Sequence, residues 1–76
     1  MDDMETLRLN KEVAERILRE VLAGPASPYA GKVLGIANGQ IVLVGDDHNA
    51  TLRRLREIEP NKLRGCRFEP SRVEHV

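Results

Sequence analysis

The chain has 76 residues, the size of one small domain, and a chain this short buries only about 60% of its unfolded surface. Its 12 basic and 12 acidic side chains balance to a formal net charge of zero, which does not favour a strongly basic nucleic-acid-binding domain. One cysteine excludes an intrachain disulfide, and no apolar run approaches the roughly 18 residues of a membrane-spanning helix.

The charge is unevenly distributed along the chain. Residues 1–24 hold four basic and six acidic groups, whereas residues 49–76 hold seven basic and four acidic groups. The acidic start at residues 1–5 is unlike the basic beginning of a secretory signal peptide. Together with the single thiol, this start predicts a cytoplasmic protein without a membrane segment.

The first predicted element is a helix over residues 10–23. Asn10 is a favourable N-cap, and Gly24 followed by Pro25 is a favourable stop. Apolar residues recur in pairs at helical spacing, which predicts one buried stripe. The stripe consists of Val13, Ala14, Ile17, Leu18, Val21 and Leu22. Residues 1–9 are expected to be frayed.

A β-hairpin is the strongest local prediction. Two apolar runs within residues 32–45 flank Asn38-Gly39, the dipeptide that favours a two-residue type I′ turn. This turn predicts that Ile36 faces Ile41 and that Leu34 faces Leu43. One face of the hairpin would then carry Leu34, Ile36, Ile41 and Leu43, and the other Val33, Gly35, Ala37, Val42 and Val44. Both faces are apolar, so each needs a cover.

A second helix and a third strand complete the predicted elements. Asp47 is the preferred N-cap of a helix that runs to about Glu59 and stops before Pro60, with Asp46 or Asn49 as alternative caps. Its apolar positions are Leu52, Leu55 and Ile58. Residues 63–68 are then predicted to form a short strand that Pro70 ends, and residues 71–76 are expected to be frayed.

The element order predicts an α+β domain of type α-β-β-α-β with a three-stranded sheet, occupying residues 1–76 as one unit. A right-handed crossover through the second helix makes the third strand parallel to the second. We expect the third strand beside the first, with a place beside the second as the alternative. The two helices would cover opposite faces, the first helix either in its own chain or exchanged with a second copy.

The chain resembles a family of short prokaryotic domains of unknown function. The resemblance spans about residues 29–70 and rests on Tyr29-Ala30-Gly31-Lys32, the Asn38-Gly39 hairpin, Gly45-Asp46, a Leu-x-x-Leu helix and a strand ending at Pro70. Val33 and Glu69 depart from the aromatic and the valine usual in that family, and the first helix lies outside the pattern. The resemblance implies a partner-type protein, encoded as one half of a two-gene module, and it lends no catalytic residue.

Few residues are candidates for catalysis or metal binding. Two carboxylates and an imidazole are adjacent at Asp46, Asp47 and His48, and such a set can hold a divalent ion. However, adjacent side chains in one turn rarely converge on one point, and Asp is favoured as a helix cap. Cys66 lacks motif spacing to His48 or His75 and reads as a small core residue. We therefore expect no catalytic residue, no metal and no cofactor.

The remaining candidates are surfaces for a macromolecular partner. The first helix offers Val13, Ile17 and Val21, and the C-terminal part offers Arg53, Arg54, Arg64 and Arg67. The preferred hypothesis is a small non-enzymatic protein–protein interaction module that binds a protein partner or a second copy of itself. One such role is the small member of a two-gene regulatory or toxin–antitoxin-like pair. The alternative is a nucleic-acid-associated regulatory protein that uses the arginines as a phosphate-binding patch.

Overall fold

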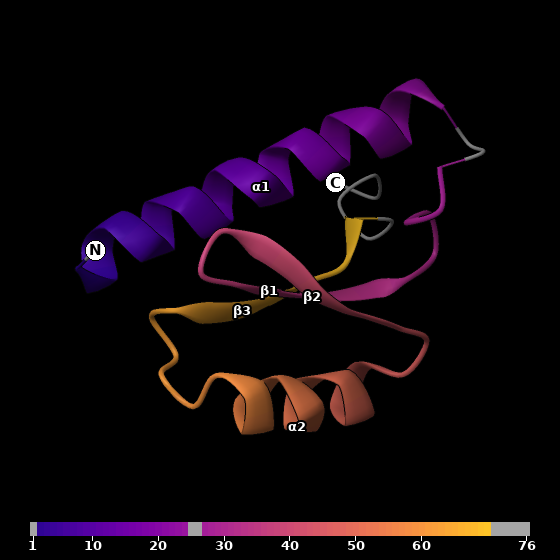
Figure 1. Ribbon diagram of the computed structural model, residues 1–76. Helices are drawn as coiled ribbons and strands as arrows, with labels where there is room; N and C mark the ends of the chain where they lie inside the picture. Colours follow the sequence, from indigo (N-terminus) through magenta and orange to yellow (C-terminus); the bar gives the residue numbers. More distant parts are fainter. Residues whose placement is uncertain (1, 25–26, 71–76) are drawn as a thin grey trace.

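Two helices lie on opposite faces of a three-stranded sheet in the computed structural model, which describes residues 2–24 and 27–70 (Figure 1). The elements are α1 (Asp3–Ala23), β1 (Val33–Ala37), β2 (Gln40–Gly45), α2 (His48–Ile58) and β3 (Gly65–Phe68). The α+β class and the order α-β-β-α-β are as predicted. No helix in the described part of the chain is both long and apolar enough to cross a bilayer.

Helix α1 begins seven residues earlier than predicted, at Asp3 instead of Asn10. Asp2 is the N-cap, and its side chain accepts a hydrogen bond from the Glu5 N–H. The predicted fraying of residues 1–9 is therefore wrong from Asp3 onward, whereas residues 71–76 lie outside the described part. The early start escaped prediction because Thr6 and Asn10, both buried, interrupt the apolar periodicity with polar side chains.

The sheet has the predicted strand order, with β1 in the centre between β2 and β3. Strand β1 pairs antiparallel with both neighbours, so β2 and β3 run parallel to each other. Asn38 and Gly39 both have positive φ, 52° and 79°, as a type I′ turn requires. The hairpin and the crossover connection are thus confirmed.

The pairing register of the hairpin changes at Val42, which the sequence did not predict. Ile36 faces Ile41 as expected, but Gly35 faces Leu43 and Leu34 faces Val44. This is a β-bulge, in which one extra residue on β2 shifts every later side chain to the other face. The predicted face that combined Leu34 with Leu43 is therefore wrong.

The bulge allows Leu43 to pack under α2. An added Cβ at Gly35 would lie 3.1 Å from the Leu43 Cβ and 3.3 Å from the Leu55 Cδ1, so Gly35 provides the room for this contact. Asp47 caps α2 as predicted, accepting from the Ala50 N–H. Strand β3 begins at Gly65, two residues later than predicted.

Each apolar face of the sheet is covered by a helix of the same chain. On the α1 side, the core cluster contains Val13, Ile17, Val21, Leu34 and Ile36. On the α2 side, Leu55 is completely buried. The requirement for a cover on each face is therefore met within one molecule, without exchange of α1 between copies.

Candidate functional site

The turn before α2 does not form a metal or catalytic cluster. The Asp46 carboxylate pairs with the Lys32 ammonium at 2.5 Å, Asp47 caps the helix, and the His48 Nδ1 contacts the Glu69 carboxylate. Three adjacent side chains thus have three different partners. Within residues 2–24 and 27–70, no group of three or more His, Cys, Asp or Glu residues is placed to hold a metal ion.

Cys66 is a packing residue on β3. Its side chain is half-buried and lies against the core cluster on the α1 side. Burial raises the pKa of the Cys66 thiol, which keeps it in the protonated, weakly nucleophilic form at neutral pH. His75, its other candidate partner, lies outside the described residues.

The structure corrects the expected contact surface on the first helix. Val13, Ile17 and Val21 are all buried against the sheet of their own chain. The apolar stripe predicted from their spacing faces the sheet, but Leu22, predicted as its last member, is 58% exposed. These three side chains leave no exposed surface for a partner.

Two of the four candidate arginines pair with carboxylates of their own chain. The Arg64 Nε donates to the Asp3 carboxylate at 2.6 Å, and the Arg67 Nε lies 4.0 Å from a Glu69 oxygen. Only Arg53 and Arg54, on α2, are exposed. Two residues are a small fraction of the phosphate contacts that a nucleic-acid-binding surface normally makes.

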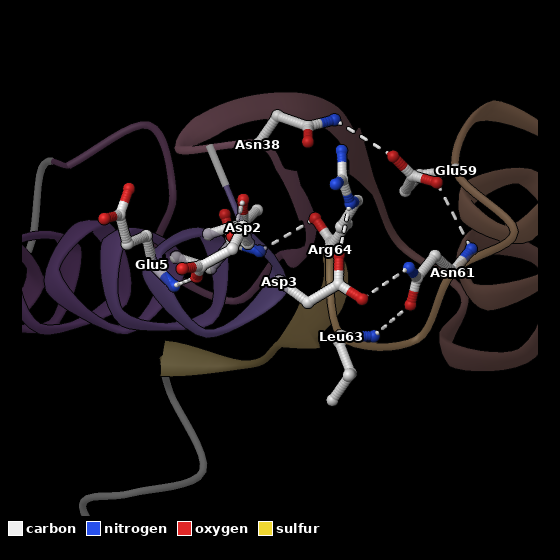
Figure 2. Close-up of polar contacts among 10 residues, drawn as sticks. Asp2, Asp3, Glu5, Asn38, Glu59, Asn61, Leu63 and Arg64 are labelled. Carbon is white, nitrogen blue, oxygen red and sulfur yellow. Dashed lines mark hydrogen bonds and ion pairs between the residues drawn. The ribbon is translucent and has the colours of Figure 1, made fainter.

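A polar cluster that the sequence analysis did not predict joins α1 and the end of α2 to the turn ends of the sheet (Figure 2). The Asp3 carboxylate accepts from Arg64 and from the Asn61 amide, and Glu59 accepts from the Asn38 amide. These bonds lower the pKa of Asp3, through Arg64 first and Asn61 second, and that of Glu59, chiefly through Asn38. This cluster is occupied by internal partners and serves the fold.

Strand β3 is an edge strand whose outer side is protected. It has four residues, including the charged Arg67, and Pro70 follows shortly after it. The Arg56 guanidinium donates to the Gly65 carbonyl at 3.1 Å and thereby occupies a backbone acceptor of this strand. Short length, charge and proline are the means by which proteins block unwanted pairing at sheet edges.

Strand β2 is the opposite edge of the sheet, and it has neither the charge nor the proline that protects β3. Its β-bulge is a protective feature of another kind. Its sequence, Gln-Ile-Val-Leu-Val-Gly, has six residues and no charge. The backbone groups of β2 form no hydrogen bond beyond those to β1 among the described residues. The Val44 side chain is 52% exposed. An edge of this kind can accept an additional strand.

A groove of about 510 Å³ runs beside this edge, between β2 and the first turns of α2. It is lined by Leu43, Val44, Gly45, Asp46, Asp47, Ala50, Thr51 and Arg54. Gly45 is one of these lining residues, and an added Cβ there would lie 2.4 Å from the Thr51 Oγ1, so the Thr51 side chain would have to shift. The groove could not be predicted from the sequence, because it depends on the bulge in β2.

Comparison of the chain with protein-family models, with curated proteins and with solved structures finds no match. The open β2 edge and its groove are therefore the candidate site on geometry alone.

Proposed function

We propose that this protein is a small non-enzymatic protein-binding module that engages its partner through the edge of β2. The observation that carries the proposal is the unprotected, uncharged edge strand, beside a groove, in a sheet whose faces are both covered. Strand addition supplies affinity through backbone hydrogen bonds, and side-chain pockets beside the strand supply specificity.

The resemblance over residues 29–70 adds the context of a two-gene module. The proposed partner is then the product of an adjacent gene, and the module is its small regulatory or toxin–antitoxin-like companion. A chain of 76 residues has little surface for a large interface. Addition of a strand from the partner requires only one sheet edge and therefore suits a protein of this size.

The test is co-expression of the tagged chain with each adjacent gene, followed by size-exclusion chromatography of the purified proteins. We expect a stable complex of defined stoichiometry that a Val44→Lys substitution weakens, because a charged residue at a strand edge opposes pairing. Failure of every adjacent product to bind would contradict the two-gene context.

The nucleic-acid alternative has a separate readout. Labelled single- and double-stranded DNA and RNA are titrated with the protein at low salt, where phosphate contacts are strongest. We expect no binding, because Arg64 is engaged by Asp3 and only Arg53 and Arg54 of the candidate arginines are exposed. Salt-sensitive binding that is lost in an Arg53→Glu, Arg54→Glu double variant would replace the protein-binding proposal.

A further inference from the structure

The groove beside β2 has opposite charges at its two ends. One face of α2 contributes four of the lining residues, Asp47, Ala50, Thr51 and Arg54, at the spacing of one side of a helix. Asp47 is the N-cap of α2, and Arg54 lies about 10 Å further along the helix axis. A carboxylate therefore lies at one end of this face and a guanidinium at the other.

Both charges remain available to a ligand. The Asp47 carboxylate accepts a hydrogen bond from the Ala50 N–H through its Oδ2 and keeps its negative charge. Its neighbour Asp46 pairs with Lys32, but the Asp46 side chain is 81% exposed and can meet a second cation. Arg54 is exposed and has no ion pair or hydrogen bond within residues 2–24 and 27–70. The groove therefore attracts a cation at its Asp47 end and an anion at its Arg54 end.

A buried hydroxyl without a partner lies between the two charged ends. Thr51 lines the groove and is only 5% exposed. Its Oγ1 lies against Gly45, where an added Cβ would be 2.4 Å away. This hydroxyl forms no hydrogen bond with any other described residue. Because buried polar groups are normally hydrogen-bonded, the Thr51 hydroxyl is a bonding position for the occupant of the groove.

The open edge of β2 determines the form of that occupant. Leu43, Val44 and Gly45 are both the last residues of β2 and one wall of the groove. A strand added to this edge would run beside the groove and rise about 3.3 Å per residue. About three of its residues would then span the distance between the two charged ends.

We infer that the groove binds an extended segment of the partner protein that carries a Lys or Arg and, two to four residues away, an Asp or Glu. The basic side chain meets Asp46 and Asp47, and the acidic side chain meets Arg54, which suits a carboxylate. A segment with charges of one sign would match one end of the groove and be repelled by the other. This inference rests on the proposed function and specifies the partner's chemistry.

The β2 strand of a second copy does not have this chemistry. Its sequence, Gln-Ile-Val-Leu-Val-Gly, carries no charge. If β2 paired with β2, the added strand would match neither the carboxylate end nor the Arg54 end of the groove. The charge pattern therefore favours a segment of another protein.

The probe is a displayed library of short random peptides selected against the folded wild-type chain. We expect enrichment of peptides that place one basic and one acidic residue two to four positions apart among β-branched residues. The tightest peptide is then synthesised in three forms, which are the selected sequence, one with lysine in place of its acidic residue and one with glutamine in place of both charges. Fluorescence anisotropy gives the Kd of each form.

Charge reversal in the protein tests the assigned anchor. Arg54→Glu should weaken the selected peptide about fivefold or more, and it should bind the form with lysine in place of the acidic residue more tightly than the wild type does. Arg53→Glu is the matched control, because Arg53 is an adjacent exposed arginine of α2 that does not line the groove. It should change each Kd less than about twofold.

Two milder variants test the rest of the groove. Asp47→Asn keeps a side chain that caps helices well but removes its charge, so it should weaken the selected peptide about threefold while the protein stays folded by circular dichroism. Thr51→Val removes the hydroxyl at nearly constant volume and should also weaken the peptide about threefold. The thermal midpoint of Thr51→Val should not fall, because the hydroxyl bonds no other described residue.

The outcomes separate this inference from the proposed function. Enriched peptides without paired opposite charges, or equal Kd values for Arg54→Glu and Arg53→Glu, would overturn the inference, while a complex with an adjacent gene product would still support a binding module. Absence of any enriched peptide would also overturn the inference, and together with no binding to an adjacent gene product it would overturn both. A dimer in sedimentation equilibrium that Val44→Lys dissociates would assign the edge to a second copy and overturn the inference.

Discussion

Asn10 is the residue whose role differs most from its predicted one. Instead of capping a helix, it lies in the middle of α1, where it is buried. Its Nδ2 donates to the Arg64 carbonyl at 2.9 Å, and its Oδ1 accepts from the Gly39 N–H at 2.7 Å. One amide thus attaches α1 to the hairpin turn and to the segment that leads into β3. A buried amide is tolerated here because both of its ends are bonded.

Replacement of Asn10 by alanine should destabilise the protein by about 1–3 kcal/mol, because it leaves the Gly39 N–H without its acceptor. The Arg64 carbonyl keeps its bond from the Asn38 N–H, so the loss is mainly one-sided. Urea unfolding followed by circular dichroism measures the change. The exposed neighbour Lys11→Ala is the control, and equal stability of the two variants would contradict the bridging role.

Acid should weaken the contact between α1 and the loop before β3. Hydrogen bonds from Arg64 and Asn61 hold the pKa of Asp3 below its ordinary value of 3.8, and those from Asn38 and Asn61 hold that of Glu59 below 4.5. A carboxylate with a lowered folded-state pKa contributes stability that is present above its unfolded-state pKa. This contribution is lost as the pH falls through the folded-state pKa.

The measurement is the free energy of unfolding of wild type and Asp3→Asn across the acid range. Wild type should be the more stable at neutral pH, and the difference should shrink as the pH falls below about 3.8. A difference that stays constant or grows in acid would show that the Asp3 charge is not responsible.

At the scale of elements, features with a local chemical signal were predictable. The Asn38-Gly39 turn, the Asp47 cap and the stop before Pro60 each depend on a few adjacent residues, and each is confirmed. The parallel direction of β3 relative to β2 followed from the crossover connection, and the strand order was the preferred one of two alternatives. These predictions needed no knowledge of packing.

The bulge in β2 and the early start of α1 depend on tertiary packing, and neither has a local chemical signal in the sequence. The hairpin is apolar on both faces, so its sequence contains no alternation that could reveal a change of register at Val42. The start of α1 is concealed because Thr6 and Asn10 are polar residues that the tertiary structure buries. The groove could not be predicted for the first of these reasons, since the bulge brings Leu43 to its wall.

A methyl group at Gly35 tests the packing that the bulge creates. Gly35→Ala should cost about 1–3 kcal/mol, because the new Cβ would press on the Leu43 Cβ and the Leu55 Cδ1 in a packed interior. Gly24→Ala is a matched control, since its added Cβ would meet nothing closer than 3.8 Å. Thermal unfolding of both variants provides the comparison, and equal midpoints would contradict the close packing of β1, β2 and α2.

At the scale of the molecule, the apolar surfaces expected to bind a partner are buried between the helices and the sheet. Because α1 and α2 cover both faces of the sheet, no second copy is needed as a cover, and the edge of β2 is the part of the sheet that stays open. Binding through this edge, as we propose, would not require a large exposed apolar patch, which would favour aggregation.

The chain should accordingly be a monomer when it is alone. Sedimentation equilibrium of the wild type at increasing concentration should give the mass of one chain, 8.5 kDa, throughout. Val44→Lys should give the same mass. A concentration-dependent rise in mass for the wild type alone would show that the edge pairs with a second copy.

Amide NMR of the isotope-labelled chain, titrated with the adjacent gene product that binds it, tests most directly whether β2 is the binding edge. We expect the largest shift changes in β2 and the first two turns of α2, with new protection of β2 amides from hydrogen exchange. Changes concentrated on β3 or on the outer face of α1, with β2 unaffected, would contradict the account.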